Sequence, residues 1–268
     1  MHRFFIPPEW IDKEMVVIRE KLVHQIRNVL RLRGGDHIVV LDDTGWEYKV
    51  ELLRVSRDRV EGVIGERRLA AEPGTRITLY QAMLKSNKFE FILQKCTELG
   101  VAGFVPVICE RCVAGHPRDK RVERWRSIIV EAAEQSRRGR LPTLEPVMPF
   151  EEACKSAIGF SLLAWEREKT SGLRTLLRSE IYRKRIISEK NYLAVNLFIG
   201  PEGGFSPFEV ELARGYGITP ISLGSRVVRS ETAGLITATA ILYECGDLEN
   251  PISSSIASAV SKPSKSTR

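Results

Sequence analysis

The sequence has few cysteines and no long hydrophobic run. Its five cysteines are an odd number and sparse for a chain of 268 residues, so they do not suggest the disulfide framework of a small secreted domain. No stretch approaches the roughly 18 consecutive apolar residues of a membrane-spanning helix. The first residues, Met1–Phe5, are too short an apolar segment for a secretory signal, and charged residues soon follow them. We therefore expect a cytoplasmic protein that does not associate with membranes.

Two of the cysteines form a CxxC motif, Cys109-Glu110-Arg111-Cys112, with His116 close behind. A structural zinc site usually takes a second pair of ligands at a matching spacing. The sequence has no such pair, so a chance occurrence is favoured over metal or redox use. We predict no metal site.

The composition is that of an ordinary globular protein, with 43% hydrophobic and 28% charged residues. The net charge is +7, but it is not evenly spread. Residues 1–72 are balanced, whereas residues 111–140 hold nine basic and four acidic residues. A concentrated basic stretch is typical of a surface that meets phosphates. A solvated helix face is the commoner explanation of such a run and stays open here.

The first 72 residues predict a small β-barrel. Strands are expected at residues 38–41, 46–55 and 60–64, separated by short turns. One helix is expected at about residues 20–31. Its apolar face would hold Leu22, Ile26, Val29 and Leu30, and the opposite face would carry a cationic strip of His24, Arg27 and Arg31.

From residue 73 to residue 247, predicted strands and helices alternate, which favours an α/β domain with a largely parallel sheet. Pro73-Gly74 marks the linker between the two parts. One helix is expected over residues 87–99, with a capping box of Asn87 and Glu90 and with Gly100 after its end, and a second over residues 120–138. Residues 248–268 are rich in Ser and Lys, and we expect them to form a disordered tail.

A glycine-rich loop follows the predicted strand that ends at Ile199. It reads Gly200-Pro201-Glu202-Gly203-Gly204, and Ser206, Pro207 and Glu209 then form a capping box that starts a helix. Open α/β sheets bind ligands at this end of their strands, and glycine lets the backbone come close to them. The loop matches neither nucleotide-binding fingerprint, so a nicotinamide or nucleotide enzyme is not supported. A plain tight turn is an equally good explanation of the loop alone.

A second loop, Leu223–Arg229, also follows a strand and precedes a helix. Arg226 and Arg229 stand at the start of that helix, where positive charge opposes the helix dipole, so an anionic ligand would resolve the conflict. Lys85 and Lys88 flank another helix start in the same way, which favours contact with phosphates. Small residues in the helix after Arg229 would allow close packing against a neighbouring helix or subunit.

Five segments together resemble the bacterial 16S ribosomal RNA (uracil-N3)-methyltransferase family of the SPOUT superfamily. They occur in the family's order and spacing, and the last two are specific. The segments are His24–Arg31, Lys95–Gly100, Glu131–Arg138, Ile199–Gly204 and Leu223–Ala233.

The resemblance implies a PUA-like β-barrel, a trefoil-knotted α/β domain, a homodimer, and 16S ribosomal RNA or the small ribosomal subunit as substrate. It also implies that S-adenosylmethionine is the cofactor and that the knotted loops hold it. By position, the implied cofactor-binding residues are Trp165, Gly200, Pro201, Glu202, Gly203, Gly204, Leu223, Gly224 and Val228.

The chemistry that the family performs then suggests roles for particular residues. Uracil N3 must lose a proton before it can take a methyl group, so a cation that stabilises the uracil anion is needed. Arg229, with Glu231 nearby, is the candidate for catalysis. The candidates for binding RNA are His24, Arg27, Arg31, Lys85, Lys88, Arg111, Arg137 and Arg138.

Two alternatives remain from the sequence. One is a non-catalytic RNA-binding protein that uses the barrel, although such a protein would have no use for the glycine-rich loop or for the segment Arg229–Ala233. The other is a SPOUT methyltransferase with a different RNA target, such as a ribose 2′-hydroxyl.

Overall fold

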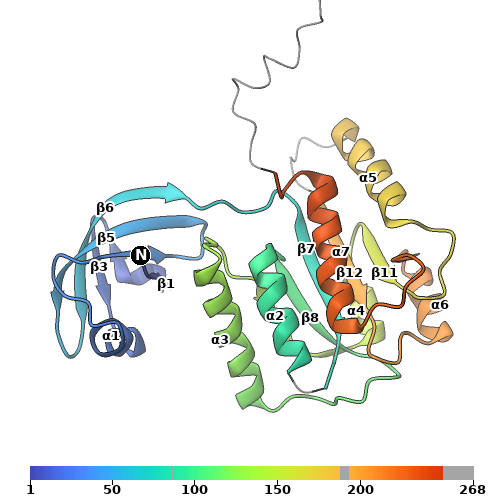
Figure 1. Ribbon diagram of the computed structural model, residues 1–268, viewed down its shortest axis with the longest axis horizontal. Helices are drawn as coiled ribbons and strands as arrows, with labels where there is room; N and C mark the ends of the chain where they lie inside the picture. The colour runs from blue at the N-terminus through green and yellow to red at the C-terminus, as the bar shows by residue number, and fades with distance from the viewer. Residues whose placement is uncertain (86, 188–192, 250–268) are drawn as a thin grey trace, which may run out of the picture.

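The computed structural model describes residues 1–85, 87–187 and 193–249, and two β-sheets organise them. Figure 1 shows a smaller, curved sheet beside a larger sheet that carries most of the helices. The tail expected from residue 248 lies outside the described residues, apart from its first two positions.

The smaller sheet is a half-barrel of six strands in the order β1-β4-β5-β6-β3-β2. Apart from β1, which runs parallel to β4, neighbouring strands are antiparallel. The sheet ends at β1 on one side and β2 on the other, which differs from a closed barrel. Its strands are β1 (Arg3–Phe5), β2 (Ile11–Asp12), β3 (Met15–Ile18), β4 (His37–Leu41), β5 (Trp46–Val55) and β6 (Val60–Leu69), with a 3-10 turn at Pro8–Trp10.

Alternating apolar residues make the inner face of the half-barrel. In β5, Val50 and Leu52 are buried, whereas Lys49, Glu51 and Leu53 between and beside them are exposed. This period of two is what a strand with one buried face requires. The inner face packs on the short helical segment that follows β3, through Val23 and Ile26.

That helical segment differs from the expected regular helix. A single turn, α1 (Lys21–His24), continues as a π-helical turn over Gln25–Val29, where the Leu30 amide donates to the Gln25 carbonyl. The wider π turn rotates side chains away from α-helical positions. Val29 is therefore 63% exposed, and the expectation that it joins the apolar face was wrong. Arg31 lies beyond the helix in a left-handed conformation, φ +57°.

In the larger sheet, all neighbouring strands among the described residues are parallel. Their order is β10-β8-β7-β12-β11-β13, and β9 lies beside β8. The α/β fold with a parallel sheet is confirmed. The strands are β7 (Arg76–Ala82), β8 (Gly103–Ile108), β9 (Thr143–Leu144), β10 (Met148–Pro149), β11 (Ser161–Ala164), β12 (Ala194–Ile199) and β13 (Thr219–Ile221).

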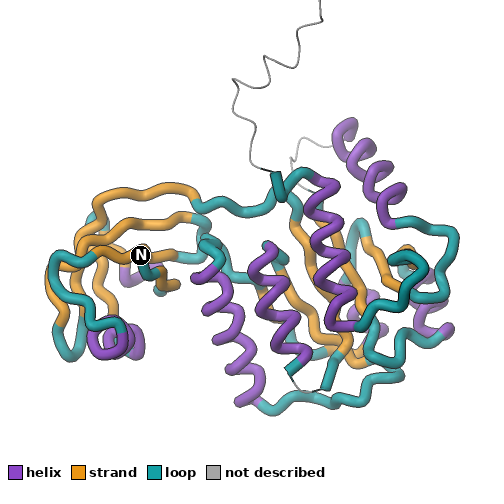
Figure 2. The backbone as a smooth tube through the Cα atoms, in the orientation of Figure 1, coloured by secondary structure: helices purple, strands orange, loops and turns teal. Residues whose placement is uncertain are grey.

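Helices cover both faces of this sheet, as the tube in Figure 2 shows. One core joins the sheet to α2 (Lys88–Leu99), α3 (Asp119–Gln135), α5 (Leu173–Ile187) and α7 (Ser230–Cys245). A second core on the opposite face joins it to α4 (Phe150–Ser156) and α6 (Pro207–Gly215). The trefoil knot stays a prediction, because strand order and pairing do not define how a chain threads.

Two helix ends differ from their predictions. Asn87 has helical backbone angles and makes no side-chain capping hydrogen bond, so the expected capping box with Glu90 was wrong. The helix expected to reach Arg138 ends at Gln135, because Arg137 adopts a left-handed conformation with φ +64°. Gly100 ends α2 with φ +107°, as its position predicted.

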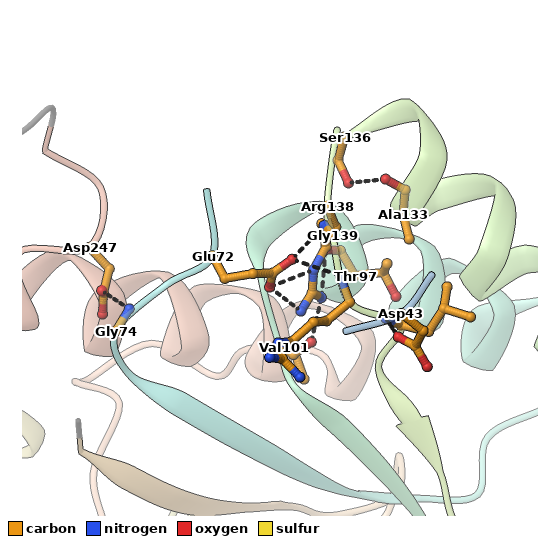
Figure 3. A network of polar contacts seen from close by, with 12 residues as sticks. Asp43, Glu72, Gly74, Thr97, Val101, Ala133, Ser136, Arg138, Gly139 and Asp247 are labelled. Carbon is orange, nitrogen blue, oxygen red and sulfur yellow. Dashed lines mark hydrogen bonds and ion pairs between the residues drawn. The ribbon is translucent and has the colours of Figure 1, made fainter. Parts of the chain in front are cut away.

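The loop after α3 joins the two sheets through Arg138, which Figure 3 shows in a network of polar contacts. Arg138 is 5% exposed and donates to the carbonyls of Thr97 (3.2 Å) and Val101 (2.6 Å). It also pairs with Glu72, in the linker after β6, at 2.9 Å. The prediction that Arg138 binds RNA was therefore wrong, since its guanidinium is buried among acceptors of the protein itself.

Candidate functional site

A cavity of about 460 Å³ lies beyond the carboxyl ends of β11, β12 and β13. This is the end of a parallel sheet at which α/β proteins bind ligands. Three stretches of chain form its walls, namely residues 164–166, 199–205 and 223–231, and Lys88 and Ala233 complete the lining.

The glycine-rich loop after β12 forms the wall at residues 199–205. Gly204 has φ +67°, a conformation that favours glycine, and a Cβ there would lie 3.1 Å from the Glu166 carboxylate. The predicted capping box follows the loop: Ser206 accepts from the Glu209 amide, and Glu209 accepts from the Ser206 amide. The start of α6 therefore holds the loop in place.

Two contacts from the turn after β8 reach this loop and the helix that follows it. The Glu110 amide donates to the second oxygen of the Glu209 carboxylate at 2.8 Å. The Arg111 guanidinium donates to the Gly203 carbonyl at 3.0 Å. Arg111, predicted to bind RNA, is thus already engaged in supporting the cavity wall.

Ser230 joins the glycine-rich loop to the loop at residues 223–229. Its hydroxyl donates to the Gly200 carbonyl and accepts from the Gln81 side chain, 3.1 Å away in β7. Gly224 in the loop at residues 223–229 has φ +100°, so this loop too contains a turn that favours glycine. A buried chain of hydrogen bonds therefore fixes the two loops relative to each other.

Lys88, in the first turn of α2, connects the loop to α7. Its ammonium lies 3.3 Å from the Glu202 carboxylate and 3.4 Å from the Glu231 carboxylate. Glu231 has a side chain only 16% exposed, whereas Arg229 at the N-cap of α7 is exposed. The predicted catalytic pair thus combines an accessible cation with a sheltered carboxylate.

Two buried polar atoms of the cavity residues have no hydrogen-bond partner in the described chain. They are Trp165 Nε1 and Glu231 Oε2; Lys88 is close enough to Glu231 for an ion pair but is not placed for a hydrogen bond. Leaving such groups unsatisfied costs roughly 1–3 kcal/mol each. An indole N–H donor and a carboxylate acceptor at one cavity therefore suit a polar ligand.

The structure brings together every residue predicted for cofactor binding and catalysis. The lining includes Trp165, all five residues of Gly200–Gly204, Leu223, Gly224, Val228, Arg229 and Glu231. Glu166 and Phe205 also line the cavity but were not predicted from the sequence. Their proximity to Trp165 and Gly204 in the chain was a signal that both belonged to the site.

The residues predicted to bind RNA are dispersed. His24, Arg27 and Arg31 are exposed on the half-barrel, whereas Lys85 and Arg137 are exposed on the larger domain. Of the whole predicted set, Lys88 alone lines the cavity. RNA binding by the exposed residues stays a prediction.

The CxxC motif lies at the end of β8, next to the turn that supports the cavity wall. The Cys109 amide donates to the Cys112 sulfur at 3.3 Å. The hydrogen bond from the Cys109 thiol lowers the pKa of Cys112 to about 7, and the same bond together with burial raises the pKa of Cys109. Throughout the described residues, no three His, Cys, Asp or Glu side chains are grouped as metal ligands.

None of the described helices has both the length and the apolar character that crossing a membrane requires.

Comparison with known proteins gives the family. The model of the RNA methyltransferase domain matches residues 71–242. The ribosomal RNA small subunit methyltransferase E of Bacillus subtilis is 33% identical over 229 residues, which are 83% of this chain and 87% of that protein. The protein of the same name from Synechocystis is 31% identical, over 90% of this chain and 77% of its own length.

Solved structures of similar fold indicate the same family. The crystal structure of a ribosomal RNA small subunit methyltransferase E from Neisseria gonorrhoeae, bound to S-adenosyl methionine, has a TM-score of 0.77 and 28% identity, covering 91% of this chain and 97% of that one. The structure of a putative methyltransferase from Legionella pneumophila, in complex with the same cofactor, has a TM-score of 0.75 and 29% identity. The match covers 90% of this chain and 96% of that one. The family that the five sequence motifs indicated is confirmed: the chain belongs to the RNA methyltransferases, among the ribosomal RNA small subunit methyltransferases E.

Proposed function

We propose that this protein transfers the methyl group of S-adenosylmethionine to N3 of a uridine in 16S ribosomal RNA, as a cytoplasmic homodimer acting on the RNA or on the small ribosomal subunit. One observation carries the proposal. The two loops that the motifs mark for the cofactor meet at one cavity, together with Arg229, Glu231 and two unsatisfied polar atoms. The membership of the chain in an RNA methyltransferase family supports it.

The cavity suits the cofactor in both chemistry and shape. The Trp165 indole N–H is a donor for a polar group of the ligand, and the turns at Gly204 and Gly224 allow close approach of the backbone. When bound, S-adenosylmethionine supplies a methyl group on a positively charged sulfur, which keeps the electron pair of the broken S–C bond. The residues of the protein bind and orient the cofactor and the uracil, and one of them accepts the N3 proton.

Glu231 is suited to accept the proton of uracil N3. Its Oε2 is buried at the cavity and has no hydrogen-bond partner among the described residues. Once N3 has lost its proton, its lone pair forms the new N–C bond, and negative charge develops on the uracil carbonyls until that bond is made. Arg229 is exposed beside the same cavity and is the cation that would stabilise this charge.

The homodimer is supported by the outer surface of α7. Ile236 and Tyr243 are 39% and 63% exposed on this helix, and Ala240 lies exposed between them. Small and apolar side chains on an outer helix face allow a second helix to pack closely. Light scattering of the purified protein would measure the mass in solution directly.

Nucleoside analysis tests the reaction itself. The protein is incubated with S-adenosylmethionine and either 16S ribosomal RNA or small subunits that lack the modification, and the digested RNA is analysed by mass spectrometry. 3-Methyluridine is the expected product. 2′-O-methyluridine would favour the alternative SPOUT activity, and the absence of both product and cofactor binding would leave an RNA-binding protein.

A pair of glycine variants tests the location of the cofactor. Gly204 and Gly217 both have positive φ, +67° and +77°, but only Gly204 lines the cavity; a Cβ at Gly217 meets nothing within 4 Å. Both Gly→Val substitutions therefore carry a similar backbone strain. Calorimetry should show that Gly204→Val loses S-adenosylmethionine binding and that Gly217→Val keeps it. Equal affinities would place the cofactor elsewhere.

A further inference from the structure

A buried glutamine in β7 lies directly behind the glycine-rich loop. Gln81 is fully buried and does not line the cavity, yet its side chain donates to Ser230, which in turn donates to the Gly200 carbonyl. We propose that Gln81 is a positioning residue for the cofactor. Acting through Ser230, it fixes the orientation of the Gly200–Pro201 peptide and so sets the affinity for S-adenosylmethionine. The proposal rests on the function proposed above.

The direction of each hydrogen bond in this chain follows from its two ends. The carbonyl of Ala82 can only accept, and it lies 3.2 Å from Gln81 Nε2, so the amide must present its nitrogen on this side. The same nitrogen donates to the Ser230 hydroxyl. The single proton of that hydroxyl is therefore free for the Gly200 carbonyl, which also can only accept. Gln81 thus determines in which direction the serine donates.

The Gly200 carbonyl belongs to a peptide that cannot be held from its other side. The nitrogen of this peptide is that of Pro201, which carries no hydrogen and cannot donate. Both residues are buried in the fold, and both line the cavity just beyond the end of β12. A hydrogen bond to the carbonyl therefore sets the plane of the peptide at which this wall of the cavity begins.

The stability of the fold does not by itself explain this glutamine. Its Oε1 is buried without a hydrogen-bond partner in the described chain, which costs free energy. Opposite it lies Gly234, inside α7, where glycine is less favourable than alanine. A Cβ on Gly234 would lie only 3.3 Å from Oε1, so the missing side chain makes room for the glutamine. Two unfavourable residue choices thus meet at one contact, which is typical of a functional site.

The same sheet holds a matched control nearer the amino ends of β11 and β12. Asn196 donates from its side-chain amide to the Ile158 carbonyl and to the Ser161 hydroxyl, each at 3.0 Å. Gln81 has the same pattern of one carbonyl and one serine. None of the three control residues lines the cavity. Loss of the Asn196 amide therefore reports the effect of such a change on stability alone.

Four variants test the proposal: Gln81→Met, Ser230→Ala, the double variant of these two, and Asn196→Leu. Gln81→Met and Asn196→Leu nearly preserve the volume of the side chain and remove its donors. Calorimetry measures the affinity of each protein for S-adenosylmethionine, and urea denaturation measures its free energy of unfolding. Initial rates with RNA give kcat and the KM for the cofactor.

Gln81→Met and Ser230→Ala should each weaken cofactor binding about 5- to 10-fold, the loss expected for one hydrogen bond. The KM for the cofactor should rise by the same factor, while kcat at saturating cofactor changes less than about 2-fold, because the bound state and the transition state lose the same contact. The double variant should bind no more weakly than the weaker single variant, since both substitutions break one chain. Asn196→Leu should bind as the wild type, whatever its stability.

Hydrogen exchange of the free protein gives a readout that needs no cofactor. The Gly204 amide donates to the Pro201 carbonyl at 2.9 Å, so its exchange reports whether the loop is ordered. Exchange in a peptide that covers residues 199–205 should be faster in Gln81→Met and Ser230→Ala than in the wild type. It should be unchanged in Asn196→Leu.

Other results would overturn the role of Gln81. Wild-type affinity and exchange in Gln81→Met would show that Ser230 needs no partner. Losses that add in the double variant would show that Gln81 does not act through Ser230, and an equal loss of affinity in Asn196→Leu would make the effect one of general stability. If the wild-type protein binds no S-adenosylmethionine, the proposed function fails and takes the cofactor role of Gln81 with it. The exchange data would then still show whether Gln81 orders the loop.

Discussion

Arg138 and Glu72 form a buried ion pair, Nη2 to Oε2 at 2.9 Å, where the linker between the two sheets passes the end of α3 (Figure 3). The same carboxylate accepts from the amides of Gly139 and Arg140, so one side chain from the linker fixes three consecutive residues of the loop. Arg137, immediately before them, is exposed. Arg138 therefore stabilises the fold, whereas the adjacent Arg137 is accessible to a ligand.

Arg138→Ala should destabilise the protein strongly. Removing one partner of a buried ion pair leaves the other charge uncompensated, which costs about 3 kcal/mol of the free energy of unfolding. Arg137→Ala is the matched control and should change that free energy by less than about 0.5 kcal/mol. Urea denaturation of both variants measures the difference, and similar values for the two would contradict the structural role of Arg138.

Arg137→Ala and Arg27→Ala should instead weaken RNA binding. Both side chains are exposed, and a lost phosphate contact lowers affinity and reduces the slope of log affinity against log salt by about 1. Titrations of RNA at several salt concentrations give both quantities. An unchanged slope in either variant would remove that arginine from the phosphate-binding surface.

Glu134 should make the stability of the protein fall as pH rises. It lies between α3 and the half-barrel, where it accepts from the Phe5 amide at 3.0 Å, and burial raises its pKa from 4.5 to about 7. Between these two values the unfolded state loses the proton while the folded state keeps it, so stability declines from about pH 4.5 to about pH 7. The nearby Glu131 adds to the effect and Arg3 opposes it.

Glu134→Gln removes this titration but keeps an acceptor for the Phe5 amide. The variant should therefore gain stability relative to the wild type as pH rises from 5 to 8, by on the order of 1 kcal/mol after allowance for solvent screening. Denaturation at both pH values measures the change. A difference between variant and wild type that is the same at both would show that Glu134 does not titrate in this range.

Cys112 should be the first cysteine to react with an alkylating reagent. Its pKa is lowered to about 7 by the Cys109 thiol, and the thiolate is the nucleophilic form. Cys245 is a useful comparison because it is also partly exposed, but burial raises its pKa. Limited iodoacetamide treatment at pH 7.5 followed by peptide mass spectrometry shows in which order the cysteines are alkylated. Faster labelling of Cys245 would contradict the prediction.

Arg229→Ala should reduce the rate of methylation about 100- to 1000-fold, the range for loss of one donor to a developing anion. Cofactor affinity should change little if Arg229 acts mainly on the base. Arg174→Ala serves as the control, because that side chain is exposed on α5 and pairs with Glu244. Single-turnover kinetics separates the chemical step from binding. An equal rate in Arg229→Ala and wild type would exclude the catalytic role.

Local patterns were enough to predict several parts of the fold. The capping box of Ser206 and Glu209 and the glycine that ends α2 depend on residues within one turn of each other. The π turn at Gln25–Val29 did not follow from apolar spacing, because spacing assumes a regular α-helix. The capping box expected at Asn87 also failed, since the pattern of residue types is present but the backbone angles are not.

The sequence by itself determined the alternation of strands and helices, the two loops at strand ends and the family motifs, because each depends on residues that are close together in the chain. Only the tertiary structure decided which charges serve the fold and which remain accessible. Arg137 and Arg138 are alike in sequence, yet Glu72, far away in the chain, buries just one of them. The contact of Lys88 with Glu202 and Glu231 likewise joins three distant segments. Such pairings depend on how the sheets and helices pack, and no local pattern specifies them.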